Sequence, residues 1–339
     1  MRVDGPLVTP SLPDVADAAR AMEAAGYDGA FTFEGPHDPF LPLVLAADAT
    51  EHLELTTAVA IAFARSPMTI AAQAHDLQVL SAGRFHLGLG SQIRPHIERR
   101  VSMPWSAPAA RMRELVLAVR AIWATWNERV PLRFEGEHYT HTLMTPFFDP
   151  GPSPVGPPPM WLGGVGPLMT EVAGEVADGF MVHPFCTQQS LLEVTLPALE
   201  RGRARPGAVA TPIQVSLPVM IATGIDAASM EAAVAAVRAQ IAFYGSTPAY
   251  RVVLDVHGWG DLQPVLRDLT RAGDWGGMAD VVHDELLHAV AIVAEPDHVA
   301  AEVRRRYGSM LHRVALNAPY QADPEVWRQI ATDLRTTEP

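Results

Sequence analysis

The feature that most constrains the fold of this 339-residue chain is an alternation of short apolar segments with stretches of helical spacing. In most of the intervals between the apolar segments, apolar residues recur every three or four positions, which is typical of amphipathic helices. Because strands that alternate with helices pair in parallel, the pattern predicts an α/β protein with a parallel sheet. The strand candidates are residues 3–9, 27–33, 53–63, 84–90, 160–164, 179–184, 213–224 and 311–319.

Two architectures compete for such a pattern, an open doubly wound sheet and a closed (β/α)8 TIM barrel. Eight strand candidates in a chain of this length favour the barrel, as a single domain over residues 1–339. Residues 91–160, between the fourth and fifth strands, leave the alternation. They hold one strong helix at 108–126 and a segment at 145–159 that is too rich in proline for helix or central strand. We expect this insertion to shape the mouth of the barrel.

Charge and composition exclude several classes of function. A net charge of -13 argues against binding to nucleic acid or to acidic membranes. The single cysteine, Cys186, excludes an internal disulfide framework and fits a reducing compartment. The N-terminal stretch lacks a signal-peptide pattern, and no apolar run approaches the roughly 20 residues needed to span a bilayer. The expectation is a cytoplasmic protein that acts on a small molecule.

In a parallel barrel the active site lies where the strands end at their carboxyl side. The loop after the second strand, residues 34–40, offers Glu34, His37 and Asp38 at this position. His37 is the first choice for a general acid or base, with Glu34 or Asp38 orienting it. Alternatively, His37 is a structural hydrogen-bonding group and Asp38, which precedes a proline, is a turn former.

A glycine-rich loop follows the fifth strand. Gly163, Gly164 and Gly166 lack Cβ atoms, so their backbone N–H groups can approach an anion closely. Pro167 suits the first position of a helix, and the N-terminus of a helix favours a phosphate. The loop is equally compatible with a tight turn that packs helix against strand. Small residues in 56–63, at the end of the third strand, similarly leave room for a flat ring or simply pack in the barrel.

Basic residues follow the fourth strand. Arg94, Arg99 and Arg100 stand just beyond its glycines, and Arg111 and Arg113 are candidates to join them. Such a cluster attracts an anionic ligand, or it is a solvated helix start whose arginines pair with nearby glutamates. Metal binding has little support, because the chain has neither an H-E-x-x-H motif nor cysteine pairs.

Taken together, these motifs resemble the luciferase-like monooxygenase family of bacterial luciferase-type flavoproteins. The resemblance spans most of the chain and is strongest over residues 56–92 and 160–184, where "SAGRFHLGLG" and "MWLGGVGP" follow in the family's order. The segments "HDPFLPLVLAA", "MTPFFDPGP" and "YGSTPAYRVVL" look like a subgroup usually assigned to the deazaflavin coenzyme F420.

The resemblance implies a (β/α)8 barrel and a set of cofactor contacts. It implies a non-proline cis peptide at Ala58-Val59, forming a bulge behind the central ring of the flavin. It also implies a phosphate near the start of the helix after strand five, and a cofactor flanked by the loop after strand four. To these contacts we add His183, which ends the sixth strand. The implied cofactor-binding residues are thus Ala58, Val59, Gly90, Ser91, Gln92, Gly163, Gly164, Val165, Gly166 and His183.

The chain departs from the family in two places. Several members carry an acidic residue and a histidine side by side after strand two, whereas Gly35 and Pro36 separate Glu34 from His37 here. Members that oxidise a sugar phosphate with F420 carry a glutamate just beyond the glycines of strand four, where this chain has Gln92 and Ile93. The second departure argues against oxidation of a sugar phosphate by that mechanism.

The resemblance therefore implies an F420-dependent oxidoreductase that transfers a hydride between C5 of the deazaflavin and a small organic substrate. One alternative is an FMN-dependent monooxygenase on the same fold. Another is a flavin-binding protein without catalytic activity. The cluster at residues 94–100 is a candidate contact for the polyglutamate tail of F420. The resemblance also implies a homodimer.

Overall fold

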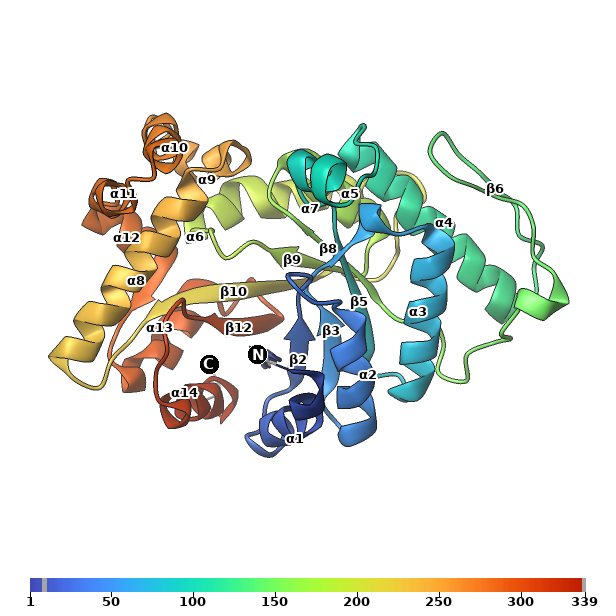
Figure 1. Ribbon diagram of the computed structural model, residues 1–339, viewed down its shortest axis with the longest axis horizontal. Helices are drawn as coiled ribbons and strands as arrows, with labels where there is room; N and C mark the ends of the chain where they lie inside the picture. Colours follow the sequence, from blue (N-terminus) through green and yellow to red (C-terminus); the bar gives the residue numbers. More distant parts are fainter. Residues whose placement is uncertain (8–10, 337–339) are drawn as a thin grey trace.

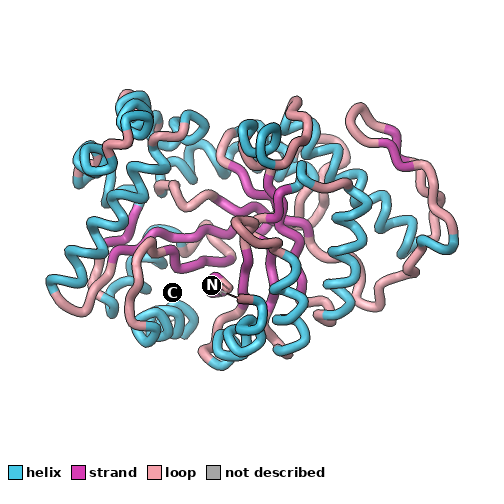
Figure 2. The backbone as a smooth tube through the Cα atoms, viewed as in Figure 1, coloured by secondary structure: helices cyan, strands magenta, loops and turns pink. Residues whose placement is uncertain are grey.

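The computed structural model describes residues 1–7 and 11–336, and it confirms the predicted (β/α)8 barrel. Eight parallel strands form the ring, and pairing of the last strand with the first closes it. Figure 2 shows these strands at the centre of the molecule with helices around them. In ring order the strands are β1 (Arg2–Pro6), β2 (Gly29–Thr32), β3 (Glu54–Thr57), β5 (Phe85–Gly90), β8 (Met160–Gly164), β9 (Gly179–Val182), β10 (Gln214–Ala222) and β12 (Arg313–Asn317).

Each predicted strand overlaps one strand of the ring. The largest difference is in the third prediction, residues 53–63, because β3 ends at Thr57. Residues 8 and 9 of the first prediction lie outside the described residues. The structure also has four shorter strands that the sequence did not predict separately. They are β4 (Ala60–Ile61), which pairs with β5; β11 (Ala291–Val293), which pairs with β10; and the hairpin strands β6 (Phe134–Glu135) and β7 (Thr140–His141).

The helices lie on the outside of the ring (Figure 1). The longer ones are α1 (Val15–Ala24), α2 (Phe40–Ala49), α3 (Pro67–Leu80), α4 (Pro108–Glu128), α5 (Pro167–Val176), α7 (Leu196–Arg203), α8 (Ala227–Gly245), α10 (Leu262–Ala272), α13 (Pro296–Tyr307) and α14 (Pro324–Thr336). The shorter ones are α6 (Gln188–Ser190), α9 (Arg251–Asp255), α11 (Trp275–Val281) and α12 (Asp284–Val290). Single turns of 3-10 or π helix occur at Leu12–Asp14, Ala62–Ala64, His96–Arg100, Pro146–Phe148, Leu191–Thr195 and Pro248–Tyr250. In the described part of the chain no helix is long and apolar enough to cross a membrane.

Local chemistry explains where the helices begin and end, as α3 shows. The Ser66 hydroxyl accepts a hydrogen bond from the backbone N–H of Thr69 at 3.1 Å, and Pro67 occupies the first helical position. Shortly after the helix ends, Gly83 adopts a φ of 90°, a left-handed conformation that glycine tolerates best. These residues stop the helix where β5 must begin.

Two excursions leave the ring. The predicted insertion at 91–160 lies between β5 and β8 and carries α4 and the β6–β7 hairpin, which projects at the right of Figure 1. A second excursion joins β10 to β12 and carries α8 to α13, with α10, α11 and α12 gathered near α8 at the left of the same view. Helices α8 to α12 share an apolar cluster of their own, which includes Val237 and Ile241 of α8 and Met220 of β10. The buried residues of α13 belong to the main core.

An ion network fills the amino-terminal end of the barrel. Arg313 of β12 is only 2% exposed, and its Nε donates to the Asp4 carboxylate at 2.7 Å. Arg313 also pairs with Glu54, which in turn pairs with Arg2. Burial raises the pKa of the Asp4 carboxyl, while the bond from Arg313 opposes that rise. The network forms a polar floor beneath the interior of the barrel.

Candidate active site

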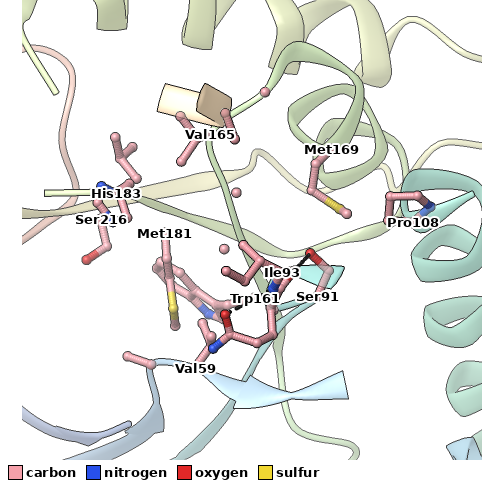
Figure 3. A pocket seen from close by; sticks show the side chains of 18 of the residues that line it. Val59, Ser91, Ile93, Pro108, Trp161, Val165, Met169, Met181, His183 and Ser216 are labelled. Atoms are coloured by element: carbon pink, nitrogen blue, oxygen red, sulfur yellow. Dashed lines mark hydrogen bonds between the residues drawn. The ribbon is translucent and has the colours of Figure 1, made fainter. Parts of the chain in front are cut away.

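A cavity of about 960 Å³ lies inside the carboxyl ends of the strands and reaches down to Asp4 and Arg313 on the floor. This volume is near the top of the range for small-molecule sites, about 300–1,000 Å³. Figure 3 shows side chains of several strands around it, among them Val59, Trp161 and Met181.

A β-bulge shapes one wall of the cavity. Thr56 pairs with His86, but Ala60 pairs with Leu89, so β3 and β4 have one residue more than β5 over the same stretch. The extra residue falls in the segment that contains the peptide bond Ala58-Val59, which is cis, as the resemblance implied. Both residues line the cavity.

Glycines on the next two strands make room for Val59. A Cβ atom added at Gly90 would lie 2.5 Å from Val59 Cγ2, and one added at Gly163 would lie 3.0 Å from Val59 Cγ1. Val59 therefore lies against bare backbone of β5 and β8. The backbone of the bulge is also fixed to β2, because Ala58 N donates to Thr32 O at 2.6 Å and Glu34 N donates to Val59 O at 3.2 Å.

The side chain of Arg65 connects the loop after β2 to the end of the bulge. Its two terminal nitrogens donate to Glu34 Oε2 at 2.6 Å and to Asp38 Oδ2 at 3.0 Å. The same Glu34 oxygen accepts from the backbone N–H of Ile61 at 2.7 Å. Glu34 and Asp38 thus brace the segment that carries Val59.

His37 lies apart from these contacts. It is exposed, and neither it nor Glu34 or Asp38 is among the residues that line the cavity. In the part of the chain that the structure describes, no hydrogen bond joins His37 to Glu34 or Asp38, because Arg65 holds both carboxylates. An acid or base role for His37 stays a prediction.

The glycine loop runs from Gly163, beside Val59, to the start of α5 on the other side of the cavity. Gly163, Gly164, Val165 and Gly166 all line it. A Cβ at Gly164 would lie 2.8 Å from Met169 Cγ, so this glycine is needed for packing inside the protein. A Cβ at Gly166 would meet nothing within 4 Å, and its φ of -78° suits any residue. The first N–H groups of a helix lack partners within the helix, so this end of α5 offers donors to an anion.

The loop after β5 also reaches the cavity. Gly90, Ser91 and Gln92 all line it, and Gln92 adopts a positive φ of 58°. The Gln92 side chain accepts a hydrogen bond from the backbone N–H of Ile93 at 3.0 Å. This contact fixes the turn that leads from the strand into the insertion.

The basic cluster expected beyond β5 is smaller than predicted. Arg94 pairs with Glu98 at 2.9 Å, and Arg94, Arg99 and Arg100 are all exposed. The prediction that Arg111 and Arg113 join this cluster was wrong. Arg113 pairs with Glu175, and Arg111 is buried, where it donates to Tyr139 and Pro104 and lies 4.5 Å from the centre of the Phe63 ring.

His183, at the end of β9, lines the cavity among aromatic rings. Its centroid lies 4.3 Å from that of Tyr250 and 4.7 Å from that of Tyr244. Burial lowers the pKa of His183 to about 4, so the ring is neutral near pH 7. Its Nδ1 accepts a hydrogen bond from the backbone N–H of Phe185 at 3.1 Å, which places the proton on Nε2. Nearby, burial raises the pKa of the Cys186 thiol to about 11, which disfavours a nucleophilic thiolate.

Several lining residues were not singled out in the sequence. Tyr250 comes from the second excursion, Trp105 from the loop before α4, and His86 and Trp161 from the barrel interior, where their rings stack with centroids 5.8 Å apart. For the two barrel residues, the alternation of inward and outward side chains along a strand was an available signal. Tyr250 lies in the segment "YGSTPAYRVVL", which the resemblance marked without assigning it a role, and no local pattern marks Trp105.

Comparisons with known proteins agree with this geometry. The family model described as luciferase-like monooxygenase matches residues 1–313. An uncharacterized protein of Mycobacterium tuberculosis is 52% identical over 93% of this chain and 92% of its own length. A 5,10-methylenetetrahydromethanopterin reductase of Archaeoglobus fulgidus is 26% identical over 90% of this chain and 89% of its own length. Among solved structures, the coenzyme F420 dependent tetrahydromethanopterin reductase from Methanopyrus kandleri matches with a TM-score of 0.76 at 20% identity, covering 98% of this chain and 96% of its own.

The open space at Gly166 allows the phosphate hypothesis to be tested without disturbing the fold. The substitution Gly166→Val should leave the melting temperature unchanged, because the new side chain meets no protein atom within 4 Å of its Cβ. It should weaken binding of the flavin-type cofactor at least tenfold, since the valine would occupy the anion site. Affinity is measured by fluorescence titration and stability by thermal unfolding.

The matched control is Gly276→Val on α11, where the nearest atom to an added Cβ lies 3.9 Å away, outside the cavity. Equal cofactor affinity in both variants would mean that the glycine loop does not bind the phosphate and serves only to pack helix against strand. The variant Gly164→Val is less decisive, because it also crowds Met169.

Proposed function

The chain belongs to the luciferase-like monooxygenase family of oxidoreductases, and on that premise we propose that it is a coenzyme F420-dependent oxidoreductase that acts on a small organic molecule. The observation that carries the proposal is the position of Val59 at the wall of the cavity. The bulge places Val59 against the glycine backbone of β5 and β8, at the wall of a cavity deep enough for a flat tricyclic ring. A Mycobacterium tuberculosis protein described as a putative coenzyme F420-dependent oxidoreductase, 28% identical over 85% of this chain, supports the choice of this coenzyme.

The residues present fit a phosphate-bearing deazaflavin. Ala58 and Val59 would support the ring, Gly90 to Gln92 would flank it, and the N–H groups at the start of α5 would hold the phosphate. When bound, a deazaflavin supplies two-electron hydride chemistry at C5 and reacts poorly with oxygen. The cavity of about 960 Å³ leaves space for a second molecule beside such a ring.

The protein would contribute orientation and exclusion of water. The Arg65 contacts to Glu34 and Asp38 keep the Val59 segment in place, so that a bound ring keeps its position relative to a substrate. Hydride transfer to a carbonyl carbon also requires a proton at the oxygen. We propose that His37, in the exposed loop after β2, exchanges this proton with solvent, with Glu34 and Asp38 fixing the loop rather than the imidazole ring.

The alternative is an FMN-dependent monooxygenase, to which the description of the family points. A third reading is a protein that binds a flavin without catalysing a reaction. These alternatives differ from the proposal in cofactor preference and in whether the bound cofactor changes its redox state.

Titration of the purified protein with each cofactor separates the proposals. We expect F420 to bind at least tenfold more tightly than FMN, as read from quenching of cofactor fluorescence. Tighter binding of FMN would replace the proposal with the monooxygenase. Binding of F420 without any change in its absorbance across a panel of alcohols and, in the reduced form, ketones would favour the non-catalytic reading.

The role of His37 has its own test. His37→Ala should lower kcat, because the proton for the substrate oxygen would lose its route of exchange with solvent through this loop, while the dissociation constant for F420 changes little. The rate is followed by the absorbance of F420 with the most active substrate of the panel. His52→Ala, which removes another exposed histidine, is the control and should keep full activity. Equal rates for the two variants would remove His37 from the mechanism.

We also propose that the chain forms a homodimer through α2. Apart from the exposed Asp48, this helix carries only apolar residues, and its outer face exposes Leu41, Val44 and Leu45 to 55%, 41% and 38%. A helix of this kind is normally covered by another element. Light scattering should give the mass of two chains for the native protein and of one chain for Leu41→Glu. Leu192→Glu, which alters an equally exposed leucine elsewhere, should stay dimeric, and a native monomer would contradict the proposal.

A further inference from the structure

The charged groups that line the cavity already have partners. The chain contains no lysine, and its 25 lysine-or-arginine positions are all arginines. Of these, only Arg94 and Arg313 line the cavity. Arg94 pairs with Glu98 at 2.9 Å, and Arg313 is held by Asp4 and Glu54. The lining histidines add no cation, since burial lowers the pKa of His86 and of His183 to about 4.

This arrangement disfavours an anionic substrate. A carboxylate or phosphate that enters the cavity loses its hydration, and it needs a cation or several donors in return. The donors at the start of α5 are those assigned to the phosphate of the cofactor. Deeper in the described lining, an anionic substrate would have to compete with Asp4 and Glu54 for Arg313. Arg94 is 67% exposed and binds Glu98 through Nε alone, so its charge is largely screened by solvent.

The wall on the side of the insertion is apolar. Trp105 packs edge-on against the buried Phe63, with ring centroids 5.8 Å apart, and Arg111 holds the neighbouring Pro104 through its carbonyl oxygen at 2.6 Å. Pro108 at the start of α4 and Met169 on α5 continue this wall, as Figure 3 shows. An apolar molecule would gain about 25 cal/mol for each Å² that it buries here.

Hydrogen-bonding side chains interrupt the apolar lining at several places, and His183 and Tyr250 are two of them. The Nε2–H of His183 has no acceptor among the residues that the structure describes, and the Tyr250 hydroxyl likewise has no hydrogen-bond partner there. Burial raises the pKa of Tyr250, so its hydroxyl stays protonated. The two rings are in contact, with centroids 4.3 Å apart. Both side chains are therefore neutral donors in the lining of the cavity.

We infer that the substrate is an uncharged, largely apolar carbonyl compound or the corresponding alcohol, whose oxygen is bound by His183 Nε2 and the Tyr250 hydroxyl. The inference rests on the proposed function and adds its substrate class. In the direction of reduction, the carbonyl carbon gains a hydride as reduced F420 loses two electrons, and the oxygen gains a proton that ultimately comes from solvent. His183 orients the oxygen but is not the acid, because its ring is already neutral and Nδ1 is occupied by the Phe185 N–H.

A matched pair of ketones tests the substrate class. In 4-methylcyclohexanone and 4-oxocyclohexanecarboxylate, a methyl group is exchanged for a carboxylate of similar size, and both are too compact for the charge to reach solvent while the carbonyl is bound. We expect the F420-loaded protein to bind the methyl compound at least tenfold more tightly, as read from the absorbance of the bound coenzyme. Equal or tighter binding of the carboxylate, or no binding of either ketone, would overturn the inference.

A pair of conservative variants tests the two donors. Tyr250→Phe removes only a hydroxyl and should raise the dissociation constant for 4-methylcyclohexanone about fivefold, the effect of losing about 1 kcal/mol from one hydrogen bond. Tyr244→Phe is the control, because Tyr244 also contacts the His183 ring but does not line the cavity. Equal affinity in the two variants would remove Tyr250 from the site.

The same ketones separate this inference from the proposed function. If the protein binds no F420, the proposed function fails, and the substrate class is then read from the shift in melting temperature of the free protein with each ketone. A larger shift with 4-methylcyclohexanone supports the inference in that case, and a larger shift with the carboxylate contradicts it. If F420 binds and the carboxylate is preferred, the inference alone fails.

Discussion

The close approach of β3 to β5 is the constraint on which the rest of the site depends. The Thr57 hydroxyl donates to Gly88 O at 2.8 Å and accepts from Gly88 N at 2.9 Å. A Cβ at Gly88 would lie only 1.8 Å from Thr57 O, so only glycine permits this contact. Just beyond this contact, the β3–β4 segment has one residue more than β5, and this extra residue turns Val59 toward the cavity. If Val59 did not turn this way, β8 would not need a glycine at position 163.

Arginines connect this bulge to the rest of the mouth. Arg65 joins the end of the bulge to the loop after β2, and Arg111 ties the insertion to Phe63, just beyond β4. A planar guanidinium with several donors suits this task, because it can bond to two or three groups in different directions. Both side chains are thereby committed to the scaffold. The ligands are left with backbone groups, apolar surface and a few neutral donors.

Much of the fold could be predicted from the sequence, because each ring strand is an apolar run bounded by glycine, proline or a helix start. The strand β11 was missed because three residues carry too little periodicity to be distinguished from the helices around them. The bond Ala58-Val59 was located by resemblance and not by any local pattern. The link from Glu34 and Asp38 to Arg65 was also missed, since it joins residues 27 and 31 positions apart that only the ring brings together. Tyr250 was missed for the same reason.

The ion network on the floor has a consequence for the order of events in the cavity. Arg313, Asp4 and Glu54 occupy the amino-terminal end of the barrel and close the cavity at that end. A molecule bound in the cavity therefore enters and leaves at the carboxyl ends of the strands, and a second molecule bound above it would have to leave first.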